Sequence, residues 1–337
     1  MSIFPFTAIV GQEQMKLSLV LNVINPTIGG VLIMGEKGTA KSTAVRSLAE
    51  LLPDMDVSQG CSFNCDPQGF LCNSCRDVLS KEGGLPKEKR RMRVVELPLG
   101  VTEDRLVGTL DIEHAIKQGE KKFEPGILAE ANRNFLYVDE VNLLEDHIVD
   151  LLLDAAAMGV NTVEREGVSF VHPARFILVG TMNPEEGDLR PQFLDRFGLC
   201  VRIESLQDKA ARKEILKRRA AFDADADSFL RQWDHEQQVL AHNIVRAQQK
   251  LQSIEFPDDA LEKIVEITAA LSLDGHRGDI VIMKASQALA ALRDNISITF
   301  DDVRDAAHLA LRHRMKRLPF EEIGLETERL QSALAGL

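Results

Sequence analysis

The chain has 337 residues, of which 45% are hydrophobic, and its 52 acidic and 40 basic side chains give a formal net charge of −12. This acidic balance argues against a nucleic-acid groove over most of the surface, because phosphate binding relies on clustered Lys and Arg. No apolar run is long enough to span a bilayer, and the first residues do not resemble a signal peptide. We therefore expect a cytoplasmic protein with no membrane insertion and no nucleic-acid partner.

Five short apolar or β-branched runs are expected to form strands, and helical patterns separate most of them. These runs cover residues 31–34, 93–98, 135–140, 176–183 and 199–204. The alternation predicts an α/β fold with a parallel five-stranded sheet, helices on both faces, and ligands at the carboxyl ends of the strands.

After about residue 205 the strand signals stop and helical periodicity takes over. The clearest helical segments are 206–222, 229–251 and 258–271. A break is expected at 272–275, a new helix at Gly278-Asp279, and a helix capped by Thr299 after that. The chain therefore divides into a larger α/β part and a smaller, all-helical C-terminal part.

A glycine-rich segment follows the first predicted strand and precedes a predicted helix; its residues are Gly35, Glu36, Lys37, Gly38, Thr39, Ala40, Lys41 and Ser42. Gly35 and Gly38 allow backbone N–H groups to point at phosphate oxygens, and the helix N-terminus adds a favourable dipole. Lys41 is expected to contact the β- and γ-phosphates, and Ser42 to bind the accompanying Mg²⁺. Ala40 replaces the usual glycine, so we expect no positive φ there. The segment predicts a nucleoside triphosphate site.

Two adjacent acids, Asp139 and Glu140, end the third predicted strand. Beside a phosphate loop, Asp139 would hold Mg²⁺ through its water shell and Glu140 would polarise the attacking water. Asn183 ends the fourth strand, where its amide could hydrogen-bond the γ-phosphate or the water. Taken alone, such acids are more often a solvated strand end, and Asn before Pro is more often a turn former.

Four cysteines, Cys61, Cys65, Cys72 and Cys75, lie within fifteen residues in the pattern C-x3-C-x6-C-x2-C. In a cytosolic chain this spacing favours tetrahedral thiolate coordination of a structural zinc ion. An iron–sulfur cluster, or unmetallated or redox-active thiols, are the alternatives. Cys200 stands apart on an apolar strand and is expected to be a buried core thiol.

Longer motifs extend this interpretation, because the chain resembles the AAA+ motor subunit family of magnesium chelatase, called subunit I. The resemblance runs from Phe4 to about Arg317. It rests on FPFTAIVGQ (4–12), LPLGVTEDR (97–105), FEPG (123–126), VEREG (163–167) and NPEEGDLRPQFLDRFG (183–198).

The resemblance implies an ATP-hydrolysing ring, expected to be a hexamer. With an integrin-domain partner subunit and a large porphyrin-binding partner subunit, it drives Mg²⁺ into protoporphyrin IX in chlorophyll or bacteriochlorophyll synthesis. Arg196 matches the family's arginine finger, positioned by Asp195, which completes a neighbour's ATP site. Arg277 matches the second sensor and Asn183 the first. The implied domains are a nucleotide-binding domain (1–205, with the cysteine insert at about 60–76), linking helices (206–250) and a helical lid (251–337).

Other functions stay open at this stage. The motor could serve a cobalt or nickel tetrapyrrole chelatase, since the cysteine tetrad does not occur throughout the chlorophyll-related members. A MoxR-like AAA+ chaperone acting on an integrin-domain partner would share Lys41, Asp139, Glu140 and Arg196. A DNA-dependent AAA+ protein would need a basic pore loop or a DNA-binding domain, and neither is visible. The basic runs at 87–93 and 312–317 are expected to face solvent or an acidic neighbour.

Overall fold

A computed structural model describes residues 2–36, 38–111, 122–165, 168–187, 189–273, 275–315 and 325–334. Several residues named above lie outside this part of the chain: Lys37, Glu166, Gly167, Asp188, Lys316 and Arg317. The chain forms two compact units. The first comprises residues 1–51 together with 182–337, and the second comprises residues 52–181.

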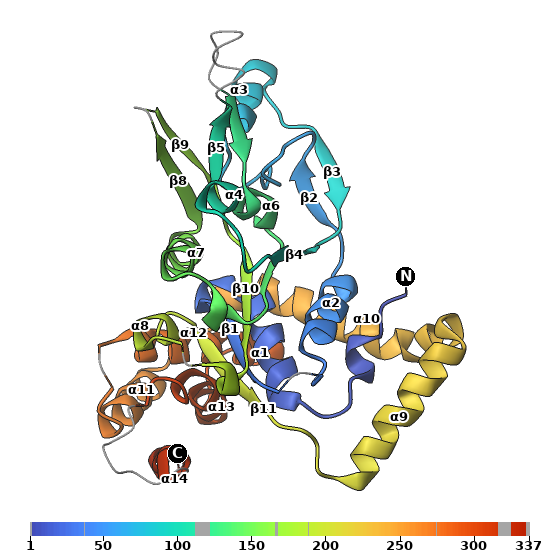
Figure 1. Cartoon of the computed structure of the whole chain (residues 1–337). Coiled ribbons are helices and arrows are strands. Elements are labelled where there is room, and N and C mark those ends of the chain that lie inside the picture. The colour runs from blue at the N-terminus through green and yellow to red at the C-terminus, as the bar shows by residue number, and fades with distance from the viewer. Residues whose placement is uncertain are drawn as a thin grey trace. The chain divides into compact units, whose positions relative to one another are not determined.

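The predicted parallel sheet is present, with strand order β11-β1-β10-β7-β4 (Figure 1). Its strands are β1 (Val31–Gly35), β4 (Val94–Leu97), β7 (Phe135–Val138), β10 (Ile177–Met182) and β11 (Leu199–Ile203). In the first unit β1 pairs in parallel with β11, and in the second unit β7 lies between β10 and β4. Every residue of β7 and β10 is buried, as expected for parallel strands covered on both faces.

In the first unit, α1 (Glu13–Ile24) and α2 (Lys41–Leu51) flank β1 in sequence, and short 3₁₀ turns precede or follow α1. These turns are η1 (Phe6–Ala8) and η2 (Pro26–Ile28). Between β10 and β11 come η4 (Pro184–Glu186) and α8 (Pro191–Leu194). Gly198, just before β11, packs closely on the end of η2: a Cβ atom at Gly198 would lie 2.1 Å from the carbonyl oxygen of Ile28. No side chain fits at Gly198 unless the backbone moves.

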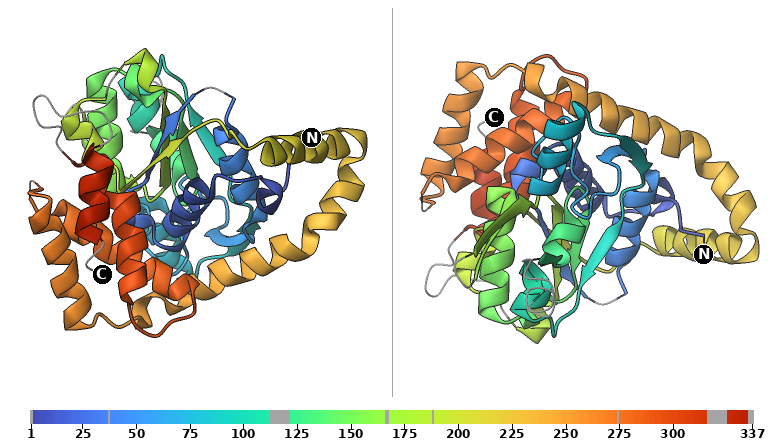
Figure 2. Two further views of the ribbon diagram at one scale, coloured as in Figure 1. Left: turned by 90° about the horizontal axis from the view of Figure 1, so that it is seen from below. Right: turned by 90° about the horizontal axis from the view of Figure 1, so that it is seen from above.

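The rest of the first unit is helical, as predicted. Its helices are α9 (Lys209–Ala224), α10 (Ala226–Lys250), η5 (Leu251–Ser253), α11 (Asp258–Ala270), α12 (Arg277–Leu292), α13 (Phe300–Leu311) and α14 (Leu325–Leu334). Both views of Figure 2 show α10 running from its junction with α9 to the C-terminal helices. Thr299 forms a capping box with Asp302 at the start of α13, which confirms the predicted helix start.

The second unit adds three two-stranded antiparallel sheets that the strand pattern did not predict: β2 (Met55–Ser58) with β3 (Lys87–Arg90), and the hairpins β5 (Gly108–Asp111) with β6 (Lys122–Pro125) and β8 (Val160–Arg165) with β9 (Val168–Pro173). Its helices are α3 (Asn73–Glu82), α4 (Glu103–Val107), α6 (Ile127–Ala131), η3 (Val141–Leu143) and α7 (Asp146–Met158). Among the described residues, no helix combines the length and apolarity that crossing a bilayer requires.

Candidate functional site

The glycine-rich segment forms a turn between β1 and α2 in the first unit. Gly35 ends β1 opposite Ile203, where a Cβ atom would lie 2.5 Å from the Ile203 carbonyl oxygen. Gly38 has a left-handed φ of 83°. Lys41 begins α2, and its ammonium group donates a hydrogen bond to the Gly35 carbonyl oxygen at 2.6 Å. The lysine thus closes the turn, and the exposed Ser42 follows in the first turn of the helix.

Ala40 departs from the sequence-based expectation, which is wrong here. Its φ is +62°, in the left-handed region, while its carbonyl oxygen accepts the first helical hydrogen bond, from the Ala44 N–H at 3.0 Å. The chain therefore needs a left-handed residue to pass from the turn into α2, as the usual glycine would supply. For alanine this conformation costs about 1–2 kcal/mol, because Cβ crowds the following carbonyl.

The acidic pair lies just after β7, in the second unit. Thr181 Oγ1 donates to Asp139 Oδ1 at 2.6 Å, and Tyr137 donates to the same oxygen at 3.1 Å. The backbone N–H of Glu140, a residue with φ of 54°, donates to Thr181 Oγ1 at 3.1 Å. Burial and the nearby Asp139 charge raise the pKa of the Tyr137 hydroxyl, which therefore stays protonated as a donor. Asp139 is thus oriented while its side chain remains exposed.

Sequence reasoning missed Thr181 and Tyr137. The available signal was a polar side chain within each of two otherwise apolar strands, β7 and β10. Because strands of a parallel sheet end at the same edge, a hydroxyl near one strand end can reach a carboxylate at the next.

Asn183 follows β10 and belongs to the first unit. Its side chain is buried, and Oδ1 accepts a hydrogen bond from the Glu185 N–H at 3.3 Å, capping η4. This is the turn-forming contact expected of Asn before Pro. A sensor role for Asn183 stays a prediction.

Asp195, at the end of α8, binds two arginines from the helical part of the first unit. Arg277 Nη1 lies 2.8 Å from Oδ2, and Arg314 Nε lies 3.1 Å from Oδ1. Arg314 also donates to the backbone carbonyl oxygens of Asp195 at 2.9 Å, Phe197 at 2.7 Å and Gly198 at 2.9 Å. The Arg314 side chain is only 4% exposed, whereas that of Arg277 is 48% exposed.

The basic run 312–317 was expected to face solvent or an acidic neighbour, and Arg314 does the second: it is buried and binds the Asp195 carboxylate. Its burial lowers the pKa of the guanidinium to about 10, still charged at neutral pH. Beside it, His313 Nε2 lies 2.9 Å from the Phe197 carbonyl oxygen. Together the two side chains hold the short segment that carries Arg196. A clustered basic run looks like a solvated face in sequence, so Arg314 could be identified only from the carbonyl groups it binds.

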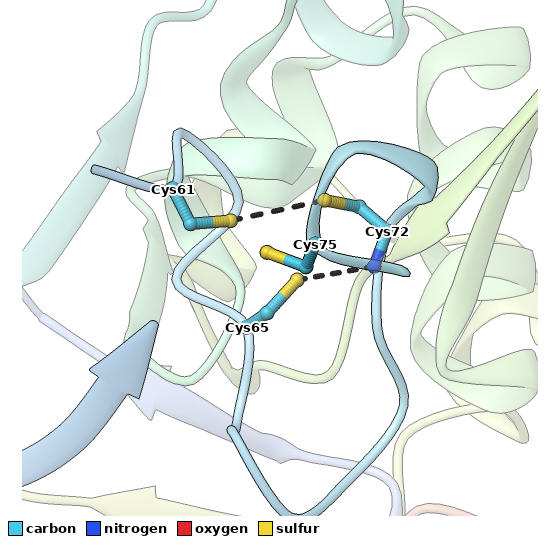
Figure 3. Close-up of side chains that lie close together, drawn as sticks. All are labelled: Cys61, Cys65, Cys72 and Cys75. Carbon is cyan, nitrogen blue, oxygen red and sulfur yellow. Dashed lines mark hydrogen bonds between the residues drawn. The ribbon is translucent and has the colours of Figure 1, made fainter. Parts of the chain in front are cut away.

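The four clustered cysteines converge in the second unit (Figure 3). Their sulfur atoms all lie within 4.8 Å of one another. All are reduced, and Cys65, Cys72 and Cys75 are buried. The fifth cysteine, Cys200 on β11, is 2% exposed, and burial raises the pKa of its thiol to about 12. Cys200 is thus the buried core thiol that was predicted.

Comparisons with known proteins agree with this arrangement. Residues 111–192 match the family model described as magnesium chelatase, subunit ChlI, and residues 261–333 match the AAA lid domain. The chain is 56% identical over 98% of its length, and 91% of the relative's, to a magnesium-chelatase subunit ChlI homolog from Methanocaldococcus jannaschii. It is 50% identical over 99% of its length to the magnesium-chelatase subunit ChlI of Nostoc sp., covering 91% of that protein.

A solved structure is also similar over nearly the whole chain. It is a model, based on single-particle cryo-EM, of the complex between subunits BchI and BchD of magnesium chelatase. The TM-score is 0.58 at 47% sequence identity, covering 98% of this chain and 100% of that one.

Proposed function

The chain belongs to the magnesium chelatase subunit ChlI family of AAA+ ATPases, and from this membership we propose how it works as the motor that couples ATP hydrolysis to insertion of Mg²⁺ into protoporphyrin IX. The observation that carries this function is the identity of about half the residues over nearly the full length of named ChlI subunits. Chlorophyll or bacteriochlorophyll synthesis is the corresponding pathway.

The ATP site is assigned to the residues that the sequence predicts. Gly35 to Ser42 would bind the nucleotide phosphates, with Lys41 exchanging the Gly35 carbonyl for β- and γ-phosphate oxygens. Ser42 and Asp139 would hold the Mg²⁺ that accompanies ATP, and the contacts from Thr181 and Tyr137 support this role for Asp139. When bound, Mg²⁺ neutralises charge on the phosphate oxygens.

Hydrolysis then needs a base and a displaced leaving group. Glu140 would accept a proton from water as the water oxygen attacks the γ-phosphorus. The bond from that phosphorus to the β–γ bridging oxygen breaks, which gives ADP and inorganic phosphate. Asn183 would hydrogen-bond the γ-phosphate or the water.

Two arginines would link hydrolysis to subunit and domain movement. Arg196 is proposed to act in trans on a neighbour's γ-phosphate, and the hold of Arg314 on the adjacent carbonyl groups supports a fixed position for it. Arg277 is proposed as the second sensor. Its exposed ion pair with Asp195 leaves its side chain able to change partner. ATP that bridges the domains would favour one lid angle, and hydrolysis would release it.

The partners follow from the family. We propose a homo-oligomeric ring, expected to be a hexamer, that works in the cytoplasm with an integrin-domain partner subunit and a porphyrin-binding partner subunit. The similar structure, a complex of BchI with BchD, supports the proposed integrin-domain partner subunit. The proposed domains are 1–205, 206–250 and 251–337, and the lid match at 261–333 supports the last. The zinc ion predicted for the cysteines takes no part in this chemistry.

Metallation of protoporphyrin IX in the presence of both purified partner subunits tests this function. ATP- and Mg²⁺-dependent product formation is expected, lost in Lys41→Ala through nucleotide binding and in Glu140→Gln through hydrolysis alone. ATP hydrolysis with Co²⁺ or Ni²⁺ insertion, but none of Mg²⁺, would move the protein to another chelatase. Hydrolysis without any insertion would favour the chaperone alternative. Mixing Arg196→Ala with Lys41→Ala subunits should restore some ATPase activity if the finger acts in trans.

A further inference from the structure

The cysteine tetrad brings four sulfur atoms from two segments to one point. Cys61 and Cys65 lie in the loop after β2, while Cys72 and Cys75 lie at the start of α3 (Figure 3). We propose that these four thiolates bind a single Zn²⁺ ion. We further propose that this ion holds the β5–β6 and β8–β9 hairpins against the segment that leads into β7. The proposal does not depend on which substrate the motor serves.

Distances favour one ion over a cluster. Four thiolates at about 2.3 Å around one Zn²⁺ ion in a tetrahedron lie about 3.8 Å from one another. The Cys61 and Cys72 sulfurs are 3.8 Å apart, and all four lie within 4.8 Å of one another. An iron–sulfur cluster spreads its thiolates over several iron atoms, so the sulfurs would lie further apart. The tetrad thus has the dimensions of a mononuclear site.

The same distances exclude a disulfide framework in this state. A disulfide bond joins two sulfurs at about 2.05 Å, whereas all five cysteines here are free. Four buried or half-buried thiols facing one another, without an ion, would give only weak sulfur–sulfur contacts. A divalent cation provides the interaction that makes such crowding favourable.

The surrounding backbone is arranged to support thiolates. The Phe63 N–H donates to Cys61 Sγ at 3.3 Å, and the Cys72 N–H donates to Cys65 Sγ at 3.2 Å. Cys72 is the N-cap of α3, and Cys75 lies in its first turn, where the helix dipole favours negative charge. Such contacts to the ligand atoms orient them toward a metal.

The loop between the first two cysteines carries Phe63, which packs into an aromatic cluster. Its ring centroid lies 5.8 Å from that of Phe170 and 4.9 Å from that of His172, both on β9. It lies 6.3 Å from Phe123 on β6, and Phe123 stacks on Phe170 at 4.1 Å. One side chain of the cysteine loop therefore joins the β5–β6 and β8–β9 hairpins.

The same loop is bonded to the segment that leads into β7. Asn132 Nδ2 donates to the Phe63 carbonyl oxygen at 2.6 Å, and Asn64 Nδ2 donates to the carbonyl oxygen of Glu130 at 3.3 Å. Asn132 Oδ1 also accepts from the Arg175 N–H, just before β10, at 2.9 Å. The cysteine loop thus contacts the segment before β7, and Asn132 connects it to Arg175 just before β10; these two strands carry the Asp139–Thr181 contact at their other ends.

Metal analysis of the purified protein gives the first test. One zinc per chain is expected, and replacement by Co²⁺ should give the absorption of a tetrahedral cobalt thiolate centre. The double variant Cys65→Ser/Cys75→Ser should lose the metal. Cys200→Ala, which removes a buried thiol from β11, should keep it. Iron with visible absorption, or no metal after anaerobic purification without chelators, would overturn the zinc site.

Hydrogen exchange on the intact protein tests the structural role without requiring a folded variant. Removing zinc with a chelator should speed amide exchange around Phe63, Phe123 and Phe170 by about tenfold or more, and zinc should reverse this change. Exchange in β1 and α2 should stay the same. If zinc is present but its removal leaves the three aromatic segments equally protected, the ion does not hold the hairpins and that part of the proposal fails.

Discussion

Arg314 binds Asp195 twice, through the carboxylate Oδ1 at 3.1 Å and through the backbone carbonyl oxygen at 2.9 Å. The same carboxylate also accepts from Arg277, at 2.8 Å. The two arginines differ in their environment: the first is 4% exposed and bonds to further carbonyl groups, and the second is 48% exposed. The Asp195 carboxylate therefore pairs with one buried and one solvent-exposed guanidinium.

Arg314→Met should lower the free energy of unfolding by about 2–4 kcal/mol, because it removes the donor to the carbonyl oxygens of Asp195 and Gly198 and the buried partner of the Asp195 carboxylate. Arg277→Met, at the exposed end of the same network, should cost at most about 1 kcal/mol. Denaturant unfolding of both variants measures the difference. Equal losses would mean that burial does not distinguish the two arginines. If Arg277 is the second sensor, its variant should lose ATPase activity while remaining about as stable as the parent.

Thr181→Val should reduce the ATPase rate by about 10–100-fold, because it removes the hydroxyl that orients Asp139 and accepts from the Glu140 N–H. Thr181→Ser should keep most of the activity. Thr268→Val, which removes another buried hydroxyl in α11, is the matched control and should have no effect on turnover. Mg²⁺ titration of the ATPase rate checks this, since a higher Mg²⁺ requirement is expected only for Thr181→Val. An unchanged requirement would remove Thr181 from the site.

Ala40→Gly should stabilise the protein by about 0.5–1 kcal/mol. Relief of the left-handed alanine, worth about 1–2 kcal/mol, exceeds the extra entropy that glycine gives the unfolded chain, about 0.4–1 kcal/mol. Ala220→Gly, at an exposed right-handed position in α9, should instead cost about 1 kcal/mol. Thermal unfolding without nucleotide compares the two. Destabilisation in both would show that the turn does not strain Ala40.

Stability should fall on acidification through His313. Desolvation and the neighbouring Arg314 charge lower the pKa of this imidazole to about 3, so between pH 6.5 and 3 the unfolded chain binds a proton that the folded chain does not. Above about pH 6.5 His313 is neutral in both states and does not reduce the free energy of unfolding. Below this pH, it lowers the free energy of unfolding by up to about 1.4 kcal/mol per pH unit. His313→Gln should therefore show a shallower loss of stability between pH 7.5 and 5.5 than the parent. Parallel curves for the parent and His313→Gln over this range would show that His313 does not cause the loss.

The central sheet and the helices could be predicted because their sequence patterns match their burial. The five strands of the parallel sheet are apolar runs that are mostly covered on both faces, and Thr299 with Asp302 is a recognisable helix start. The charged strand β3 could not be found this way. Its sequence is Lys-Glu-Lys-Arg, and it pairs with β2 across the cysteine loop, so it depends on a contact distant in sequence.

The candidate site was predictable to a similar degree. The glycine-rich turn and the acidic pair follow from local order along the chain, and the long motifs identify the family. Thr181 and Arg314 required the structure, because each acts on a group brought near by folding: the Asp139 carboxylate for one, and carbonyl oxygens 195–198 for the other. Ala40 was predicted wrongly for a different reason, although its contacts are local. A rule based on residue type excluded the backbone conformation that the turn in fact adopts.

The position of Gly35 against Ile203 also has a consequence for how the protein is made. The strand that carries the phosphate turn pairs with β11, so its partner leaves the ribosome only after most of the chain has been synthesised. Residues 52–181 form one continuous unit and can fold earlier, whereas the first 51 residues must wait for Met182 and beyond. Since a ligand stabilises only the state that binds it, cellular ATP cannot assist the young chain. Nucleotide can stabilise the first unit only after β11 has been synthesised.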